Sequence, residues 1–403
     1  MSDARAYPGW LPLLLGFLSA IGPLSTDMYL PAFPAIEAEY GLPLGSAQIT
    51  LAVWFLGLGV GQITQGALAD RFGRRTPLMF STAIFTLASV GCAMAPSFNT
   101  LIVMRLIAAL AASASMVIPT AVVRDLASGH AAATMMSRLI LVRGVGPIVA
   151  PLIGGLLLTF ASWHGIFWFG AMYGVVCWVL VVWKIPDTLP VHMRVRQNLS
   201  GMLSRYWNIL VEPSFQVHTL MSGSAMFALF AFIGGSPGVF IDGMHLTPRA
   251  FSLVFSCCAA FYIGFSQFNP SMLTRFGPSR VMQAAARVMF AGTVLLALIS
   301  FLGSAFPGWL SWWMLMPPVM MMMGTQGFIQ PNATVGALHR HSAHAGAASA
   351  LMGMLGFSMG AVSGLLAGVF SDGTPRGMAA LMLTGASLVM FADWRRRVML
   401  AKG

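Results

Sequence analysis

Long apolar stretches, separated by mostly short polar connections, follow one another along the whole chain. A helix that crosses a lipid bilayer needs about 20 consecutive, mostly apolar residues. Twelve such stretches can be delimited, and they cover residues 11–33, 48–68, 77–96, 100–122, 137–160, 164–183, 214–240, 250–270, 281–303, 309–335, 346–370 and 377–394. The pattern predicts an all-α membrane protein with twelve transmembrane helices, in which sequential helices are antiparallel neighbours.

The connection between the sixth and seventh stretches is long and polar. It divides the chain into an N-terminal six-helix half (1–183), a cytoplasmic linker (184–213) and a C-terminal six-helix half (214–403). A short repeat supports this division, because Arg71-Phe72-Gly73 follows the second stretch and Arg275-Phe276-Gly277 follows the eighth, 204 residues later. We expect two halves related by an axis along the membrane normal, as in transporters built from parallel repeats.

Charged residues are scarce. They make up 8% of the 403 residues, against about 25% in ordinary soluble domains. So few charges cannot cover a soluble globule, which excludes soluble enzymes, nucleic-acid-binding proteins and disordered chains. The net charge of +11 has a topological explanation, because cytoplasmic loops of membrane proteins collect lysine and arginine. With both termini in the cytoplasm, 17 of the 22 basic residues lie on that side, and Arg249 and Arg376 on the other.

The cysteines and histidines do not indicate a metal site or a catalytic site. The four cysteines lie in apolar stretches without metal-ligand spacing. His339, His341 and His344 fall in a short loop, where solvated side chains are a simpler interpretation than a metal tract. No stretch carries paired carboxylates or a Ser/His/Asp set, so we expect no enzyme, no catalytic residue and no metal.

Asp27 is the one acidic residue well inside a predicted span. An ionised carboxylate at depth costs about 2.5–3.5 kcal/mol on insertion scales, so it should face the helix bundle and have a partner. Pro23 and Pro31 bend or end a helix and free backbone carbonyls nearby. Asp27 is therefore a candidate proton- or cation-binding group, and the alternative is a structural acid at a helix end.

Arg105 is the predicted partner of Asp27. At the rise of an α-helix, Asp27 lies roughly 9 Å and Arg105 roughly 8 Å below the same membrane face. Opposite charges at one depth predict an ion pair inside the membrane. The alternative is that Arg105 extends to the outer headgroups.

The loop after the second stretch is patterned rather than merely basic. It reads Gly66-Ala67-Leu68-Ala69-Asp70-Arg71-Phe72-Gly73-Arg74-Arg75. Gly66 allows close helix approach and Gly73 permits a tight reversal. Asp70 can accept backbone N–H groups at a helix end or pair with Arg124.

Two further sets of residues are candidates for function. The fifth stretch is rich in small residues and prolines, which favours either close helix packing or a flexible helix between the halves; it contains Gly144, Gly146, Pro147, Pro151, Gly154 and Gly155. Polar uncharged side chains inside spans are either pocket residues or helix–helix hydrogen bonds. We take as pocket candidates Tyr29, Gln62, Tyr262, Gln330 and Asn332.

These residues make the chain resemble the major facilitator superfamily, and within it the bicyclomycin/chloramphenicol-resistance (Bcr/CflA) group of drug:proton antiporters. The loop Gly66–Arg75 is similar to the superfamily's cytoplasmic signature, and Thr26–Pro31 resembles the group's first-helix motif. Arg105 is kept from the helix 4 motif, without the Gln-Gly pair that usually follows. The stretch from Gly146 to Gly155 is similar to the antiporter signature of helix 5, at Gly146, Pro151, Gly154 and Gly155.

The resemblance implies a proton-coupled exporter of small, apolar or amphipathic molecules that works by alternating access. Asp27 and Arg105 would couple protons, and the signature loop would be the cytoplasmic gate, formed by Gly66, Asp70, Arg71, Gly73, Arg74, Arg75 and Arg124. The expected setting is the bilayer of a bacterial inner membrane, with a monomeric protein, protons as coupling ion and no cofactor. Export of a metabolite such as a nucleoside, sugar or amino acid is the alternative, and a membrane-embedded enzyme or receptor is a more distant one.

Overall fold

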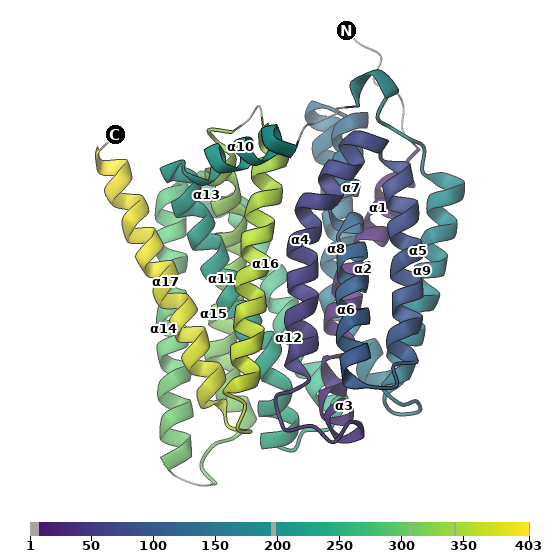
Figure 1. Ribbon diagram of the computed structural model, residues 1–403. Helices are drawn as coiled ribbons and strands as arrows, with labels where there is room; N and C mark the ends of the chain where they lie inside the picture. Colours follow the sequence, from purple (N-terminus) through teal and green to yellow (C-terminus); the bar gives the residue numbers. More distant parts are fainter. Residues whose placement is uncertain (1–7, 195–198, 306–307, 342–343, 403) are drawn as a thin grey trace. The chain divides into compact units, whose positions relative to one another are not determined.

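The computed structural model describes residues 8–194, 199–305, 308–341 and 344–402. Within these ranges the chain forms helices and no strand (Figure 1), so the predicted all-α architecture is confirmed. The contacts divide the chain into two compact units. The first comprises Met1–Tyr29 and Val53–Met202, and the second comprises Leu30–Ala52 and Leu203–Gly403.

The first unit is a bundle of long helices with a broken first span. Its elements are α1 (Leu11–Ser19), α2 (Ile21–Asp27), most of α4 (Gln48–Phe72), α5 (Arg75–Ala93), α6 (Phe98–Ala112), α7 (Ala114–Leu126), α8 (Gly129–Leu157), α9 (His164–Lys184) and the short η2 (Val191–Met193). The predicted span 100–122 is divided into α6 and α7 at Ser113. The Ser113 side chain packs directly on Gly61 of α4, where an added Cβ would overlap the serine hydroxyl.

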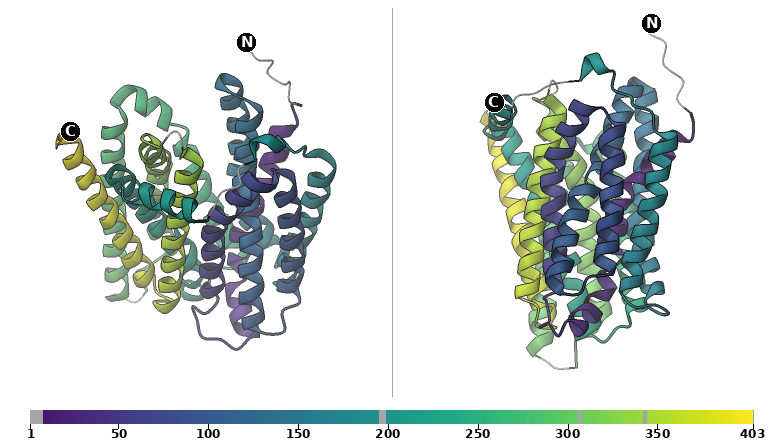
Figure 2. Two further views of the ribbon diagram at one scale, coloured as in Figure 1. Left: turned by 45° about the horizontal axis from the view of Figure 1, so that its top comes forward. Right: turned by 45° about the vertical axis from the view of Figure 1, so that its right-hand side comes forward.

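The second unit holds the remaining helices, which Figure 2 shows from two further sides. They are η1 (Leu30–Ala32), α3 (Phe33–Glu39), most of α10 (Leu199–Leu210), α11 (Pro213–Pro237), η3 (Gly238–Gly243), α12 (Pro248–Ser266), α13 (Asn269–Phe276), α14 (Pro278–Ala305), α15 (Trp312–Leu338), α16 (Ala345–Val369) and α17 (Pro375–Lys402). The predicted linker 184–213 therefore contains a helix, α10, as well as η2.

Residues 30–52 belong to the second unit although they precede most of the first. The Glu37 carboxylate accepts the backbone N–H groups of Gly45 and Ala47 at 3.0 and 2.9 Å, which closes the turn between α3 and α4. The Gln48 amide donates to the carbonyl of Gly234 in α11 at 3.2 Å. The chain thus passes from one unit to the other after Tyr29 and returns after Ala52.

Eleven helical segments of the described chain are long and apolar enough to cross a membrane. The exception among the twelve predicted stretches is the tenth. It forms the continuous 27-residue helix α15, which contains Pro317, Pro318 and Pro331 as well as polar amides and is therefore less apolar than the other spans. The predicted positions of the helices agree with the structure, and so does the break of the first span near Pro31, whereas the break at Ser113 and the helix extensions were not predicted.

Close backbone packing fixes the first span against α8. A Cβ at Gly154 would overlap the carbonyl oxygen of Met28, and one at Gly146 would lie 2.9 Å from Cβ of Pro23. The close-packing interpretation of the fifth stretch is therefore confirmed at these two glycines. Its role as a flexible helix between the halves stays a prediction. Pro151 and Gly155 are buried in the same helix.

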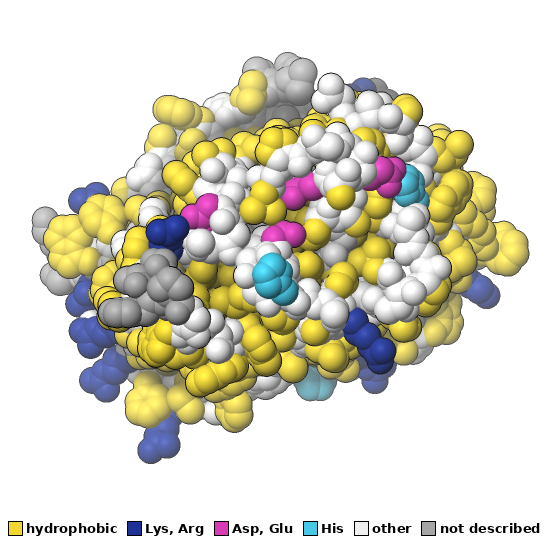
Figure 3. Space-filling view, turned by 90° about the horizontal axis from the view of Figure 1, so that it is seen from below, with side chains coloured by type: hydrophobic (Ala, Val, Ile, Leu, Met, Phe, Trp, Pro, Cys, Tyr) yellow, Lys and Arg dark blue, Asp and Glu magenta, His cyan; other side chains and the backbone are white. Residues whose placement is uncertain are grey.

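Basic residues are unevenly distributed along the helix direction. Figure 3 shows the end that lies at the bottom of Figure 1, where acidic and histidine side chains are visible and most lysines and arginines lie at the rim or are fainter and so more distant. The connection between α16 and α17, drawn at this end, carries Asp372. The positive-inside rule assigns this end to the outer face, and that orientation stays a prediction.

The close packing of α8 on the first span predicts that a methyl group added at Gly154 destabilises the protein. Gly154→Ala should destabilise the protein by about 1–3 kcal/mol, because the new Cβ can be accommodated only if the Met28 backbone moves. Thermal unfolding of the purified protein in detergent measures this. Gly144→Ala is the matched control, since a Cβ at Gly144 meets nothing within 4 Å. Equal unfolding temperatures for the two variants would contradict the packing described here.

Candidate functional site

The first span breaks where Asp27 lies. Helix α2 ends at Asp27, and Met28 and Tyr29 connect it to the short η1 turn that contains Pro31. Proline has no N–H group, so the carbonyls before it lose a helical partner and become available to other donors. Asp27 is only 6% exposed, and its carboxyl group takes part in no ion pair among the described residues.

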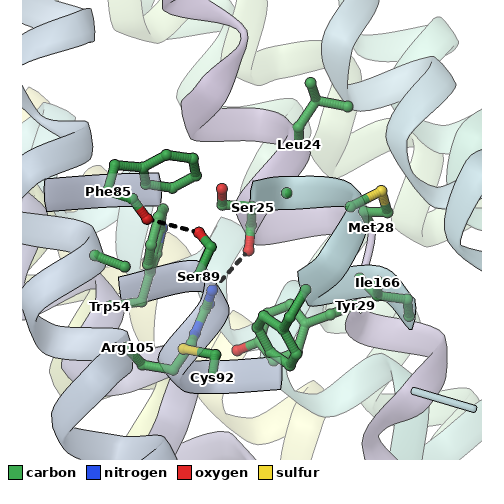
Figure 4. Close-up of a pocket in the computed structure, with 13 residues that line it drawn as sticks. Leu24, Ser25, Met28, Tyr29, Trp54, Phe85, Ser89, Cys92, Arg105 and Ile166 are labelled. Atoms are coloured by element: carbon green, nitrogen blue, oxygen red, sulfur yellow. Dashed lines mark hydrogen bonds between the residues drawn. The ribbon is translucent and has the colours of Figure 1, made fainter. Parts of the chain in front are cut away.

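Arg105 of α6 lies in an aromatic cage beside this break. The side chain is 2% exposed, and its Cζ lies 4.1 Å from the ring centroid of Tyr29 and 4.2 Å from that of Trp54. Phe167 of α9 is further away, at 5.8 Å. Nη1 donates a hydrogen bond of 3.0 Å to the carbonyl oxygen of Ser25, drawn in Figure 4. Aromatic faces attract a cation strongly when it is desolvated, so the rings stabilise the buried charge.

The predicted ion pair between Asp27 and Arg105 is absent in this structure. The guanidinium instead contacts the Ser25 carbonyl and the rings of Tyr29 and Trp54. Its Nε and Nη2 atoms have no hydrogen-bond partner among the described residues. The physical reason is that the break in the first span turns a backbone carbonyl and an aromatic ring toward the arginine, and these occupy the place that the carboxylate was expected to take.

A small cavity adjoins the Arg105 cage (Figure 4). Its volume is about 20 Å³, and its walls include Ser89 and Cys92 of α5 as well as Trp54 and Arg105. A single water molecule needs roughly 10–15 Å³ on this measure. The cavity therefore admits about one water molecule and is too small for an organic cargo.

The predicted cytoplasmic gate is an ion-pair cluster centred on Arg74. Its Nη1 lies 2.6 Å from Oδ1 of Asp70, and its Nε lies 2.8 Å from Oδ2 of Asp125 in α7. Its backbone N–H donates to Oδ1 of Asp187 at 2.8 Å. Burial opposes the charge of Arg74, but the hydrogen bonds that it donates to Asp125 and Asp70 outweigh this effect and raise the pKa of the guanidinium.

Neighbouring residues hold the same loop in place. Gly73 has a φ of +92°, and a Cβ there would overlap the carboxylate of Asp187. Arg75 donates to the carbonyl of Val182, and Arg194 pairs with Asp187 at 2.6 Å. Glycine is therefore needed at position 73 both for its backbone conformation and for the space.

Two alternatives were predicted for Asp70, backbone N–H groups or Arg124, and the pairing with Arg124 is wrong. Asp70 pairs with Arg74 one helical turn away, and exposed Arg124 makes no ion pair within the part of the chain that the structure describes. The acid that completes the cluster is Asp125, the next residue along α7. Gly66 is half-buried, and a Cβ there would touch only Val117 at 3.8 Å.

The five pocket candidates are distributed over both units. Tyr29 belongs to the Arg105 cage, and Gln62 lies half-buried on α4. The other three lie in the second unit, where Gln330 exchanges hydrogen bonds with Ser222 of α11 at 2.6 and 3.1 Å. Asn332 donates to Asn269 of α13 at 2.9 Å. Both amides therefore join helices in this structure, and Tyr262 is half-buried on α12.

Several residues of the site were not predicted. Trp54 and Phe167 had no signal in the sequence, because aromatic residues are common in membrane spans. Asp125 and Asp187 had a signal, because they are among only 11 acidic residues and each lies within three residues of a basic residue. Acids so scarce in a basic chain are natural partners for a buried arginine.

Comparison with known proteins identifies similar chains over the whole length. The model of the Major Facilitator Superfamily matches residues 15–364. An uncharacterized MFS-type transporter of Bacillus subtilis, YdgK, is 32% identical over 96% of each chain. A bicyclomycin resistance protein homolog of Haemophilus influenzae is 28% identical over 94% of this chain and 93% of its own. A chloramphenicol resistance protein of Pseudomonas aeruginosa is 28% identical over 97% and 91%.

Solved structures show the same fold at low sequence identity. The nucleoside transporter NupG superposes with a TM-score of 0.70 and 14% identity, covering 96% of this chain and 99% of its own. The xylose transporter XylE from E. coli superposes with a TM-score of 0.69 and 12% identity, over 95% and 97%. At these identities the likeness concerns the fold alone.

The Arg74 cluster predicts that Asp125, and not Arg124, stabilises the loop. Asp125→Ala should lower the unfolding free energy by about 1–3 kcal/mol, because it leaves a largely buried guanidinium nitrogen unsatisfied. Arg124→Ala removes an exposed side chain and should change stability by less than about 0.5 kcal/mol. Thermal unfolding in detergent compares the two variants. A larger loss for Arg124→Ala would show that the cluster is assigned incorrectly.

Proposed function

Because the chain belongs to the major facilitator superfamily, we propose that this membrane transporter is a proton-coupled drug exporter that works by alternating access. Membership follows from the family match across residues 15–364 and from the 32% identity to YdgK. The proposed cargo is a small, apolar or amphipathic molecule, and the proposed coupling ion is the proton. No cofactor is required for such a cycle.

The observation that carries the coupling proposal is the environment of Asp27. This carboxyl group is buried at the end of α2 and lies in no ion pair among the described residues. An unpaired charge inside a membrane protein is costly, and the C-terminal end of a helix disfavours a further negative charge. Binding a proton removes that cost, so Asp27 has a physical reason to exchange a proton when its surroundings change.

Proton exchange at Asp27 yields export if it is linked to the conformation. In the state open to the cytoplasm, Asp27 releases its proton and cargo binds. In the opposite state, a proton from the outer side returns to Asp27 and favours release of the cargo. Such coupling requires that protons and cargo bind the two states with different affinities.

Arg105 is proposed as a positioning residue for this exchange. It donates a hydrogen bond to the Ser25 carbonyl, two residues before Asp27. The rings of Tyr29 and Trp54, and not the carboxylate of Asp27, stabilise its positive charge. Asp27 is thereby left free of a fixed counter-ion. A permanent ion pair would oppose protonation, so the aromatic cage preserves the ability of Asp27 to change its charge.

The remaining assignments are part of the same proposal. The proposed cytoplasmic gate consists of the Arg74 cluster with Gly66, Arg71, Gly73, Arg75 and Arg124. The relatives named for bicyclomycin and chloramphenicol resistance support an antibiotic-like cargo. Tyr29, Gln62, Tyr262, Gln330 and Asn332 are proposed to meet it, although Gln330 and Asn332 would have to exchange their present helix–helix bonds. We place the protein in a bacterial inner membrane as a monomer, with cytoplasmic termini.

Asp27→Asn tests the proposal, because it keeps the size of the side chain and removes the exchangeable proton. In proteoliposomes loaded with chloramphenicol or ethidium, an imposed proton gradient should drive export by the unaltered protein. The variant should lose at least about 90% of that export. It should still exchange cargo at equal pH, because alternating access itself is intact.

The matched control is Asp372→Asn, which alters an exposed loop acid that bonds Thr374 and Arg376. It should export at the normal rate. A folded Asp27→Asn protein that retains gradient-driven, pH-dependent export would exclude Asp27 as the coupling group.

A further inference from the structure

A deep apolar groove lies in the second unit between α12, α13, α14 and α15. Its volume is about 490 Å³, and its walls are formed chiefly by Phe261, Phe265, Val288, Met321 and Phe328. The one hydroxyl in its depth belongs to Thr325 and donates to the carbonyl of Met322 at 2.6 Å. The groove therefore presents no unsatisfied polar side chain to an occupant until its end at Arg280.

The α14 wall of the groove continues into an exposed apolar stripe. Val288, Leu295, Leu298 and Leu302 are 43%, 41%, 55% and 51% exposed and follow one face of the helix at spacings of three, four and seven residues. No polar residue interrupts this stripe. In a membrane protein such a face contacts the acyl chains of the lipid.

Two arginines flank one end of the groove. Arg280, in the first turn of α14, forms part of its wall. The Cζ atom of Arg275 lies 5.2 Å from the ring centroid of Phe276, which is another wall residue. Both arginines are exposed and neither has an ion-pair partner among the residues that the structure describes. The N-terminus of α14 adds a partial positive charge at the same place.

The loop at the end of α4 in the first unit has a carboxylate that the loop at the end of α13 lacks. Arg71 lies over Phe72 at the same 5.2 Å, in the first copy of the Arg-Phe-Gly repeat. There the preceding residue is Asp70, which pairs with Arg74. In the second copy, 204 residues later, the preceding residue is Thr274, whose hydroxyl bonds the carbonyl of Ser271. The second loop has kept the cation and the aromatic ring without the carboxylate.

We propose that this groove is a binding site for an anionic phospholipid. One acyl chain lies in the apolar groove, and the phosphate lies between Arg280 and Arg275, where it replaces the carboxylates of the first loop. Charge complementarity selects a lipid with a net negative headgroup over a zwitterionic one, since two unpaired cations face it. The residues that line the groove include neither Asp27 nor any residue of the cargo pocket proposed above.

Native mass spectrometry of the purified full-length protein tests the headgroup. Phosphatidylglycerol and phosphatidylcholine with identical acyl chains are titrated, and phosphatidylglycerol should bind more tightly. Arg280→Ala and Arg275→Ala should each weaken it by about fivefold, as expected for one arginine at a membrane surface. Arg249→Ala, an exposed arginine at the opposite end of α12, is the control and should leave binding unchanged.

The acyl chain is tested by filling the groove. Ala284→Trp places an indole in the groove and should abolish phosphatidylglycerol binding, whereas Leu302→Trp, on the α14 stripe beyond the groove, should not. Equal binding of the two lipids, or unaltered phosphatidylglycerol binding when Arg275→Ala and Arg280→Ala are combined, would overturn the proposal. So would full competition by glycerol phosphate, which has no acyl chain. Loss of cargo binding in Ala284→Trp with normal lipid binding would instead identify a cargo groove.

Discussion

A cation buried among membrane helices has to be stabilised by the protein itself, because no bulk water reaches it. Arg105 is stabilised by a carbonyl and by aromatic faces. That solution depends on the irregular first span, which supplies the Ser25 carbonyl and the Tyr29 ring, and on α8, whose glycines let the span approach closely. The aromatic cage around Arg105 therefore depends on both the break in the first span and the glycine contacts of α8.

The loop around Arg74 uses the other solution, which is a set of carboxylates. Asp70, Asp125 and Asp187 come from three different segments and converge on one arginine and its backbone. The loop lies outside the spans, where charged groups are easier to hydrate, so an ion-pair cluster is tolerated there. The surroundings therefore determine the partners of each arginine. Arg105, inside the membrane, is stabilised by aromatic rings and a carbonyl, and Arg74, in a loop, is stabilised by carboxylates.

The apolar pattern predicted where most helices lie, because the bilayer imposes their length. It could not predict the break at Ser113 or the helix α13, which depend on contacts between helices. The depth estimate correctly placed Arg105 near the residues around Asp27, since it contacts Ser25 and Tyr29. Depth does not determine which side of a helix a side chain faces, and the ion pair itself is not formed. For the same reason Arg124 was considered as a partner of Asp70, whereas the structure pairs Asp70 with Arg74 and adds Asp125 to the same arginine. Trp54 could not be found at all, since nothing separates it from an ordinary lipid-facing aromatic residue.

The point at which the chain leaves the first unit has a mechanical consequence. Tyr29 is both a wall of the arginine cage and the last residue before the chain enters the second unit, where Glu37 and Gln48 anchor the following segment. Any displacement of that anchored segment is transmitted through the covalent backbone to a residue two positions from Asp27. Rotation about the backbone bonds between Asp27 and Tyr29, rather than a series of side-chain contacts, is therefore the shortest route by which motion of the anchored segment can reach the acid.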